Sequence, residues 1–361
     1  MGDWLRHEKT ILRGMKDEIP GVLRTAGDAK HRQNCKLSPV NPSAFKLYRH
    51  LPRHDRRTGS AVTIGNFDGV HLGHQAILRQ VREAALQRGL SPTVMTFSPH
   101  PRAFFAQRGQ RPELAPTQIS GLRDKVAMLA ACGIEQAVVL RFDQPLADLG
   151  AQAFIDRLLA DGLQTRWLLV GEDFRYGSKR SGDLALLRQA GQVHGFEVVT
   201  LADVVDPQGR RISSSEIRKD LAVGAVADAA ALLGRPYSLS GHVLHGRKLG
   251  RQLGFPTLNL RVPPRCALRS GIYVVRVHGL GEAALPGVAS LGVRPTIDQG
   301  GQLLLEVHLL DCQVQAYGKL VSVEFLSFLR DEEAFPDLPT LTAAIAADAR
   351  GARDYFALHG L

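Results

Sequence analysis

A glycine-rich turn between a short apolar run and an amphipathic run most constrains how this chain can fold. Residues 61–64 are apolar and predict a buried strand, and residues 77–85 repeat apolar side chains at helical spacing. Between them lies the string Gly65-Asn66-Phe67-Asp68-Gly69-Val70-His71-Leu72-Gly73-His74. A helix that opens after such a turn points unpaired N–H groups and its positive dipole end at the turn. The order predicts a strand, a turn and a helix with a site for phosphate.

Two histidines stand at the predicted start of this helix. His71 and His74 are three residues apart, so they would share one face. Two imidazoles beside a phosphate could donate hydrogen bonds to charge that develops on a transferring phosphoryl group. They could equally be surface or capping histidines, because His-x-Gly-His alone arises easily by chance. The full string in this context favours the phosphate site.

Composition sets the outer limits. A chain of 361 residues is long for one hydrophobic core, so we expect two domains. Hydrophobic residues at 44% and charged residues at 22% are typical of a globular protein. No apolar run approaches the ~20 residues that span a membrane, and no secretory signal is expected. The four cysteines form no Cys-x-x-Cys, which favours reduced thiols in a cytoplasmic protein.

The net charge of +10 first suggests a nucleic-acid partner, but its distribution argues against one. Residues 1–58 hold 13 Lys and Arg against 6 Asp and Glu, which leaves 32 against 29 for the rest of the chain. Residues 1–44 also lack a sustained hydrophobic period. We therefore expect a basic, disordered leader without a catalytic role, whether it is a true tail or an early start.

The pattern of apolar runs changes along the chain. Between residues 61 and 234, strand-like runs (93–97, 137–140, 167–170 and 197–200) alternate with helical patterns (122–131, 151–160 and 184–193). This alternation predicts an α/β domain with a parallel sheet, whose ligands bind beyond the carboxyl ends of the strands. After Pro236, closely spaced strands (238–243, 271–277, 303–309 and 320–328) predict a small antiparallel barrel, and residues 338–349 predict a closing helix.

The ten-residue string resembles the nucleotidyltransferase signature of the bacterial bifunctional riboflavin kinase/FAD synthetases. The resemblance covers residues 45–361 and implies a Rossmann-like nucleotidyltransferase domain at 45–234 and a riboflavin kinase barrel at 235–361. It implies phosphate-transfer roles for His71 and His74. It also implies that ATP binds at Gly65, Phe67, Asp68 and Gly69.

Three further segments resemble the first domain of this family. Pro99 and His100 match a loop that lines the nucleotide and flavin sites, although Ser98 stands where Glu is usual. Asp173 and Phe174 match residues that hold FMN or adenosine, against the alternative of a polar surface turn. The third segment starts with the predicted catalytic Arg211. It continues with Ser213, Ser214, Ser215 and Arg218, which by resemblance bind the triphosphate. Ser213 and Glu216 also form a helix-starting capping box, and Ser215 replaces the usual Thr.

The second domain has its own signature. Gly246, Gly250 and Gly254 predict a loop whose backbone can approach phosphates closely, and Arg251 lies within it. Thr257 and Asn259 are neutral oxygen donors that suit a Mg²⁺ shared with ATP. The string Pro256-Thr257-Leu258-Asn259 closely resembles the core of the riboflavin kinase motif, and the loop is not a Walker A loop.

The flavin side of the predicted kinase site rests on the resemblance. Glu306 matches the family's catalytic base, which would take the proton of the ribityl hydroxyl. Alternation alone places Glu306 on the same side as His308 and opposite Leu305, which a solvent-facing residue would also show. Arg330, Asp331, Glu332 and Phe335 resemble a flavin-side segment, in which Phe335 is the candidate for contact with the isoalloxazine. Arg294 matches another flavin-site loop, in which Ser290 replaces the usual Asn.

These resemblances imply an enzyme that makes FMN from riboflavin and then FAD from FMN, with ATP and Mg²⁺ at both sites. One alternative is an adenylyltransferase for pantetheine phosphate or nicotinamide mononucleotide, which would not need the barrel. Another is a basic nucleic-acid-binding protein. Riboflavin, FMN and ATP are the expected partners, with no nucleic acid and no membrane, and a homo-oligomer stays open.

Overall fold

A computed structural model describes residues 45–52, 59–246, 250, 253–294, 302–312 and 314–360. The predicted leader at 1–44 lies outside these residues. The chain divides into two compact units. The first holds the described residues up to Pro116 together with Lys125–Val204, and the second holds Thr117–Asp124 together with Val205–Leu361.

The first unit contains a six-stranded sheet in the order β1-β4-β3-β2-β5-β6, and every neighbouring pair is parallel. The bounds are β1 (Lys46–Tyr48), β2 (Ser60–Ile64), β3 (Ser91–Ser98), β4 (Gln136–Arg141), β5 (Thr165–Gly171) and β6 (Glu197–Leu201). The predicted parallel sheet is confirmed. The chain runs outward from β2 through β3 to β4 on one side, and β5 and β6 lie on the other side of β2.

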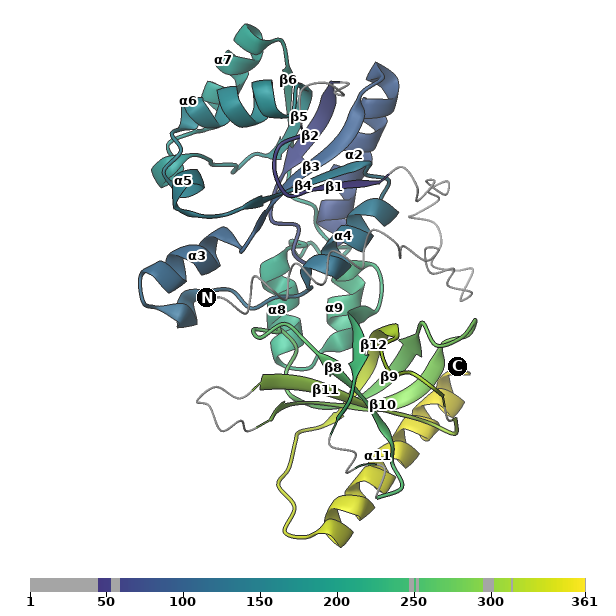
Figure 1. Cartoon of the computed structure of the whole chain (residues 1–361). Helices are drawn as coiled ribbons and strands as arrows, with labels where there is room; N and C mark the ends of the chain where they lie inside the picture. The colour runs from purple at the N-terminus through teal and green to yellow at the C-terminus, as the bar shows by residue number, and fades with distance from the viewer. Residues whose placement is uncertain are drawn as a thin grey trace. The chain divides into compact units, whose positions relative to one another are not determined.

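Helices cover both faces of this sheet (Figure 1). They are α2 (Leu72–Arg88), α3 (Pro101–Arg108), α4 (Leu122–Ala131), α5 (Gln144–Ala147), α6 (Ala151–Phe154), the π-helical turn η5 (Ile155–Gly162) and α7 (Leu184–His194), with short 3₁₀ turns η4 (Pro112–Leu114) and η6 (Ser178–Arg180). Strand β5 shows how apolar side chains cover both faces of the sheet. Leu168 and Val170 pack into one core cluster, whereas Trp167 and Leu169 pack into the other. A strand buried on both sides reads as a continuous apolar run.

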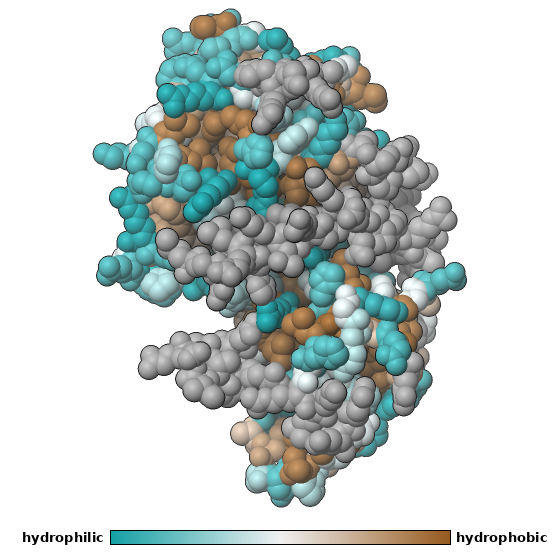
Figure 2. Space-filling model, viewed as in Figure 1, coloured by the Kyte–Doolittle hydropathy of each residue, from teal (hydrophilic) through white to brown (hydrophobic). Residues whose placement is uncertain are grey.

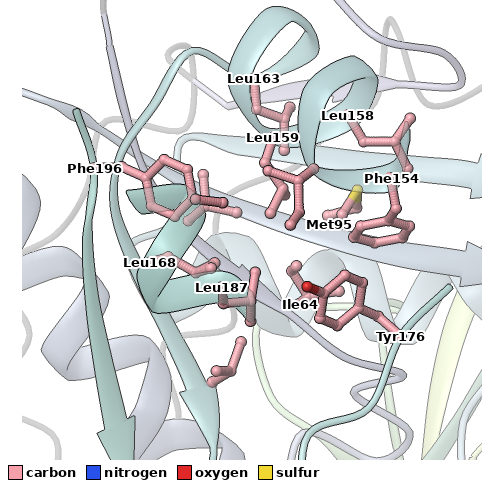
Figure 3. Packing of buried hydrophobic residues seen from close by; sticks show 14 of the residues in the cluster. Ile64, Met95, Phe154, Leu158, Leu159, Leu163, Leu168, Tyr176, Leu187 and Phe196 are labelled. Atoms are coloured by element: carbon pink, nitrogen blue, oxygen red, sulfur yellow. The ribbon is translucent and has the colours of Figure 1, made fainter. Parts of the chain in front are cut away.

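Tyr176 places a hydroxyl inside the first of these clusters. Its ring lies close to Phe154, with centroids 5.2 Å apart, and Figure 3 shows the hydroxyl directed into the cluster. The residue is 5% exposed, and the hydroxyl has no hydrogen-bond partner among the described residues. Burial raises the pKa of this phenol, and the nearby Asp183 raises it further. Tyr176 therefore buries a polar atom without compensation.

We expect Tyr176→Phe to raise the thermal midpoint of unfolding by about 2–4 °C. An unsatisfied buried hydroxyl costs about 1–3 kcal/mol, and the phenylalanine ring keeps the packing. Scanning calorimetry of both proteins measures the shift, with the exposed Tyr317→Phe as a control that should leave the midpoint unchanged. A lower midpoint for Tyr176→Phe would mean that the hydroxyl does have a partner.

The second unit contains a closed barrel in the order β10-β11-β8-β7-β12-β9, and every neighbouring pair is antiparallel. Its strands are β7 (Tyr237–Leu244), β8 (Thr257–Arg261), β9 (Gly271–His278), β10 (Leu285–Arg294), β11 (Gln302–Leu309) and β12 (Leu320–Arg330). The predicted barrel and closing helix are confirmed. Helix α11 (Leu338–His359) packs Ala349, Ala352 and Phe356 against β9 and β10.

Two helices before the barrel belong to the second unit. They are α8 (Ser214–Ala222) and α9 (Val226–Leu233), and α9 packs on β12 and β7. The carbonyl of Leu221 also accepts a hydrogen bond from the Arg269 N–H at 3.0 Å. The second compact unit thus includes residues before the barrel, from Val205 onward together with Thr117–Asp124, whereas the boundary at residue 234 stays a prediction about the functional domains.

A charged cluster lies on the face of β9 and β12 opposite the buried Val275 and Phe325. Glu324 accepts hydrogen bonds from Nε and Nη2 of Arg276 at 3.1 and 3.0 Å, and His278 Nε2 lies 3.0 Å from the same carboxylate. Burial opposes ionisation of Glu324, but His278 and Arg276 outweigh it and hold the pKa of this carboxyl below its usual value. The cluster therefore favours the charged form of Glu324.

We expect this cluster to make stability fall on acidification. A carboxyl whose pKa is lowered by folding stabilises the fold above its unfolded pKa, near 4.5 for Glu, and this contribution is lost as pH falls through the folded value. The thermal midpoint of the wild type should therefore drop more steeply than that of Glu324→Gln between about pH 6 and pH 3. Parallel midpoint curves for the two proteins would show that Glu324 contributes nothing.

The surface drawn in Figure 2 mixes hydrophilic and hydrophobic residues over short distances in both units. The most exposed large apolar side chains lie on separate helices. They are Leu86 on α2, Val193 on α7 and Leu358 on α11. Among the described helices, none combines the length and apolarity needed to cross a membrane.

Candidate active sites

The turn between β2 and α2 is held in an uncommon backbone shape. Phe67, Gly69 and Val70 have φ values of 48°, 82° and 41°, and left-handed conformations are rare for residues with a Cβ. Phe67 and Val70 are 1% and 0% exposed, so packing in the core holds the turn. A strained turn that the core fixes is typical of functional sites.

His71 and His74 meet at the start of α2. His71 is the N-cap residue, and its Nδ1 accepts a hydrogen bond from the His74 N–H at 3.3 Å. In a neutral His71 ring, this bond leaves the proton on Nε2, which makes Nε2 the donor side. The two rings stack with centroids 3.6 Å apart, and the Phe67 ring lies 4.9 Å from His74. His71 therefore caps the helix, whereas the role of the two histidines toward a phosphate stays a prediction.

The sheet brings three predicted segments to one edge. The turn after β2, the loop after β3 and the loop after β5 all leave the carboxyl ends of parallel strands. Strands β2 and β5 are neighbours in the sheet. From β2 the chain continues to β3 on one side, and from β5 it continues to β6 on the other side. Open α/β sheets bind ligands at such a switch point. His71 and Asp173 thus belong to loops that flank this point.

The loops after β3 and β5 differ in how their predicted residues are held. His100, which follows Pro99, caps α3 through a 3.1 Å hydrogen bond from the Arg102 N–H to its Nδ1. Phe174 is half-buried and stacks on Tyr176 with centroids 5.6 Å apart, whereas Asp173 is exposed. His100 is therefore held by capping a helix, whereas Phe174 is held by ring stacking.

The predicted triphosphate segment lies in the second unit. Ser213 caps α8, and its Oγ accepts the Glu216 N–H at 3.3 Å, so the predicted helix start is confirmed. Glu216 also accepts a hydrogen bond from Lys219 at 2.7 Å, and Arg218 Nε donates to the Thr117 carbonyl at 2.7 Å. Assignment of Arg211, Ser213, Ser214, Ser215 and Arg218 to the ATP phosphates stays a prediction.

The barrel brings the predicted kinase residues together through strand pairing. Glu306 on β11 pairs directly with Asn259 on β8, and His308 pairs with Thr257. Directly paired residues share a face of the sheet, so these side chains line one surface. Leu305 and Val307 are fully buried on the opposite face, as the alternation predicted.

Each described glycine of the kinase loop has its own physical reason. A Cβ on Gly246 would collide with the Asn259 amide, and a Cβ on Gly250 would collide with the Phe255 carbonyl. Gly254 has a φ of 87°, where residues with a Cβ are strained. Arg251 and the side chain of Arg294 lie outside the described residues. The backbone at Gly246 therefore comes close to the Asn259 amide.

The flavin-side segment at the end of β12 is held by polar contacts. Arg330 donates to both carboxylate oxygens of Asp348 at 2.8 and 2.7 Å, and its guanidinium carbon lies 5.7 Å from the Phe335 ring centre. Ser290 donates to Glu332 at 3.1 Å. Burial raises the pKa of Glu332, and the nearby Glu306 raises it further. Two carboxyl groups therefore lie near one another at this edge of the barrel.

Comparison with known proteins covers both units. The FAD synthetase family model matches residues 53–216, and the riboflavin kinase family model matches residues 233–356. The bifunctional riboflavin kinase/FMN adenylyltransferase of Escherichia coli (strain K12) is 43% identical over 300 residues, which cover 83% of this chain and 94% of that protein. The chain belongs to the bifunctional riboflavin kinase/FMN adenylyltransferase family.

The chain is also similar to a second relative and to a solved structure. The bifunctional riboflavin kinase/FMN adenylyltransferase of Pseudomonas fluorescens is 43% identical over 307 residues, covering 85% of this chain and 95% of that protein. A crystal structure from Streptococcus pneumoniae, named as a macrolide-efflux protein, is 28% identical with a TM-score of 0.69. It covers 86% of this chain and 99% of that chain. The family resemblance seen in the motifs is thus confirmed along most of the chain.

Sequence patterns of the family did not reveal every residue at these sites. Asp348 lies on α11 in an apolar stretch with no motif, and only the fold brings it to Arg330. The bond from Ser290 to Glu332 joins residues 42 positions apart, so no local spacing could predict it. Ser290 departs from the usual Asn of the family, and that departure was the one available signal.

Proposed function

We propose that this protein phosphorylates riboflavin to FMN and then adenylylates FMN to FAD, using ATP in both steps. Membership of the bifunctional family over 83% of the chain carries this proposal, because the matched relative contains both activities in its name. The pairing of Glu306 with Asn259 and the histidine pair at the switch point support it. ATP use and cysteines that form no Cys-x-x-Cys favour a cytoplasmic location.

Phosphorylation of riboflavin needs a base, because the ribityl hydroxyl loses a proton as it attacks the γ-phosphorus of ATP. Glu306 accepts this proton, the bond from the γ-phosphorus to its bridging oxygen breaks, and ADP leaves. Phe335 and the segment that begins at Arg330 form the flavin side of the site, with Arg294 at the end of β10. The loop with Gly246, Gly250, Arg251 and Gly254 covers the ATP phosphates.

Mg²⁺ fits the kinase residues. Thr257 and Asn259 offer neutral oxygen atoms next to the loop, and the 7% exposure of Asn259 keeps its amide in place. Neutral oxygens that leave room for water and phosphate suit this ion. Bound there, Mg²⁺ would neutralise charge on the ATP phosphates.

Adenylylation of FMN needs alignment rather than a base, because the FMN phosphate is already ionised near neutral pH. A phosphate oxygen attacks the α-phosphorus of ATP, the bond to the bridging oxygen breaks, and pyrophosphate leaves. His71 and His74 donate to the developing charge, and Arg211 and Arg218 bind the triphosphate with Ser213, Ser214 and Ser215. Gly65, Phe67, Asp68 and Gly69 shape the nucleotide turn, and Pro99, His100, Asp173 and Phe174 line the FMN side.

A product assay tests this proposal. The purified protein is incubated with riboflavin, ATP and Mg²⁺, and flavins are separated by chromatography. We expect FMN, then FAD, with ADP and pyrophosphate released. Pantetheine phosphate and nicotinamide mononucleotide serve as alternative acceptors. Adenylylation of either one without any flavin product would overturn the proposal.

A further inference from the structure

Three consecutive residues that end β12 or follow it are each held by a different element of the second unit. Arg330 pairs with Asp348 on α11. Asp331 accepts a hydrogen bond from Nη2 of Arg269 at 2.8 Å. Glu332 accepts a hydrogen bond from the Ser290 hydroxyl at 3.1 Å. Such a run of side-chain anchors fixes the path of the chain where a regular strand has ended. The segment from Arg330 to Phe335 is therefore built to a defined position.

That position lies next to the predicted base. Ser290 on β10 pairs directly with Glu306 on β11, so the hydroxyl that holds Glu332 shares a face with Glu306. The Glu332 carboxylate also lies so close to the Gly292 backbone that a Cβ at position 292 would overlap it. Moving the segment would thus change the surroundings of Glu306.

Asp348 is the anchor with the strongest geometry. Both of its oxygens accept hydrogen bonds from Arg330, at 2.8 Å from Nε and 2.7 Å from Nη2, and its side chain is 10% exposed. The remaining Arg330 nitrogen, Nη1, donates to the Asp331 carbonyl at 2.9 Å. A bidentate pair that is largely removed from water is both strong and directional. The contacts of Arg330 therefore fix the segment rather than point toward a ligand.

We infer that Asp348 is a positioning residue for riboflavin phosphorylation, acting through Arg330 to hold Glu332 and Phe335 beside Glu306. This inference rests on the proposed function. With Asn in place of Asp348, the Arg330 guanidinium loses its charged partner and one of the two acceptors, and it turns toward water, because its 26% exposed side chain has a path to solvent. The segment then loses its link to α11, and flavin binding weakens while the ATP loop, on other strands, stays intact.

The test compares Asp348→Asn with Asp311→Asn. Asp311 forms another bidentate pair with α11, to Arg353 at 3.0 and 2.8 Å, and among the described residues it has no hydrogen bond with the segment from Arg330 to Phe335. Asn tolerates the positive φ of 54° at position 311. We expect Asp348→Asn to raise the riboflavin KM, and the Kd from flavin fluorescence quenching, about tenfold. The KM for ATP and the adenylylation of added FMN should stay near wild type, and Asp311→Asn should change none of these.

A double-mutant cycle with Arg330→Met decides whether Asp348 acts through Arg330. If it does, Asp348→Asn adds no further loss of flavin affinity in the Arg330→Met background. Additive losses, or an unchanged riboflavin KM in Asp348→Asn, would overturn the inference even if the variant melts earlier. Because the wild type is assayed in parallel, absence of FMN from the wild type would instead count against the proposed function.

Discussion

Replacing His71 or His74 with Ala is expected to lower FAD formation from added FMN by roughly 10²-fold or more, the effect of removing one donor to transition-state charge. Phosphorylation of riboflavin should persist, because the predicted kinase residues belong to the barrel. Initial rates measured on the same preparations, with FMN and with riboflavin as substrates, give the rate of FAD formation and the rate of phosphorylation.

A second substitution separates chemistry from capping. His71→Asn keeps a side-chain acceptor for the His74 N–H, and Asn is among the best N-cap residues. It should restore stability but not FAD formation. The matched control is His194→Ala, because His194 pairs with Asp156 at 3.0 Å outside these loops and should not affect the rate. Recovery of full activity in His71→Asn would mean that the histidine only caps the helix.

The other large effect is expected at Glu306. Glu306→Gln should slow phosphoryl transfer to riboflavin by about 10² or more, the usual range for a general base, while flavin binding is largely kept. The amide has nearly the same shape as the carboxylate but cannot accept the proton. Single-turnover rates with saturating ATP and fluorescence titration with riboflavin separate the two effects.

Glu282 is exposed, so Glu282→Gln is the control for this change of charge. This variant should phosphorylate riboflavin at the normal rate. Adenylylation of added FMN by Glu306→Gln should also be normal. Unchanged phosphorylation in Glu306→Gln would remove the residue from the mechanism and return it to a solvent-facing position on β11.

The spacing of apolar residues in the sequence predicted helices and strands well where a single helical or strand-like pattern dominates a segment. The helical pattern at 122–131 coincides with α4, and the apolar runs at 93–97 and 167–170 lie within β3 and β5. The expected helix at 151–160 is helical but changes at Ile155 into the π-helical turn η5, which the spacing of apolar residues does not distinguish. Capping by Ser213 also followed from local chemistry.

Features that depend on distant pairing could not be predicted in the same way. Register between β8 and β11 places Asn259 opposite Glu306, 47 positions later, and only the closed barrel sets that register. The short strand β1 and the long strand β10 were not expected, because glycine and proline interrupt the apolar pattern of β10 and β1 has three residues. The predicted site residue Arg294 on β10 was therefore found by resemblance rather than by periodicity.

The central claim is that one chain carries out two successive transfers from ATP to a flavin, and isotope tracing tests it most directly. The protein is incubated with riboflavin, Mg²⁺ and ATP labelled with ³²P at either the γ- or the α-phosphorus, and FMN and FAD are separated. The γ label should appear in FMN and then in FAD, whereas the α label should appear in FAD alone. Label from the α-phosphorus in FMN, or FAD without the γ label, would contradict the central claim.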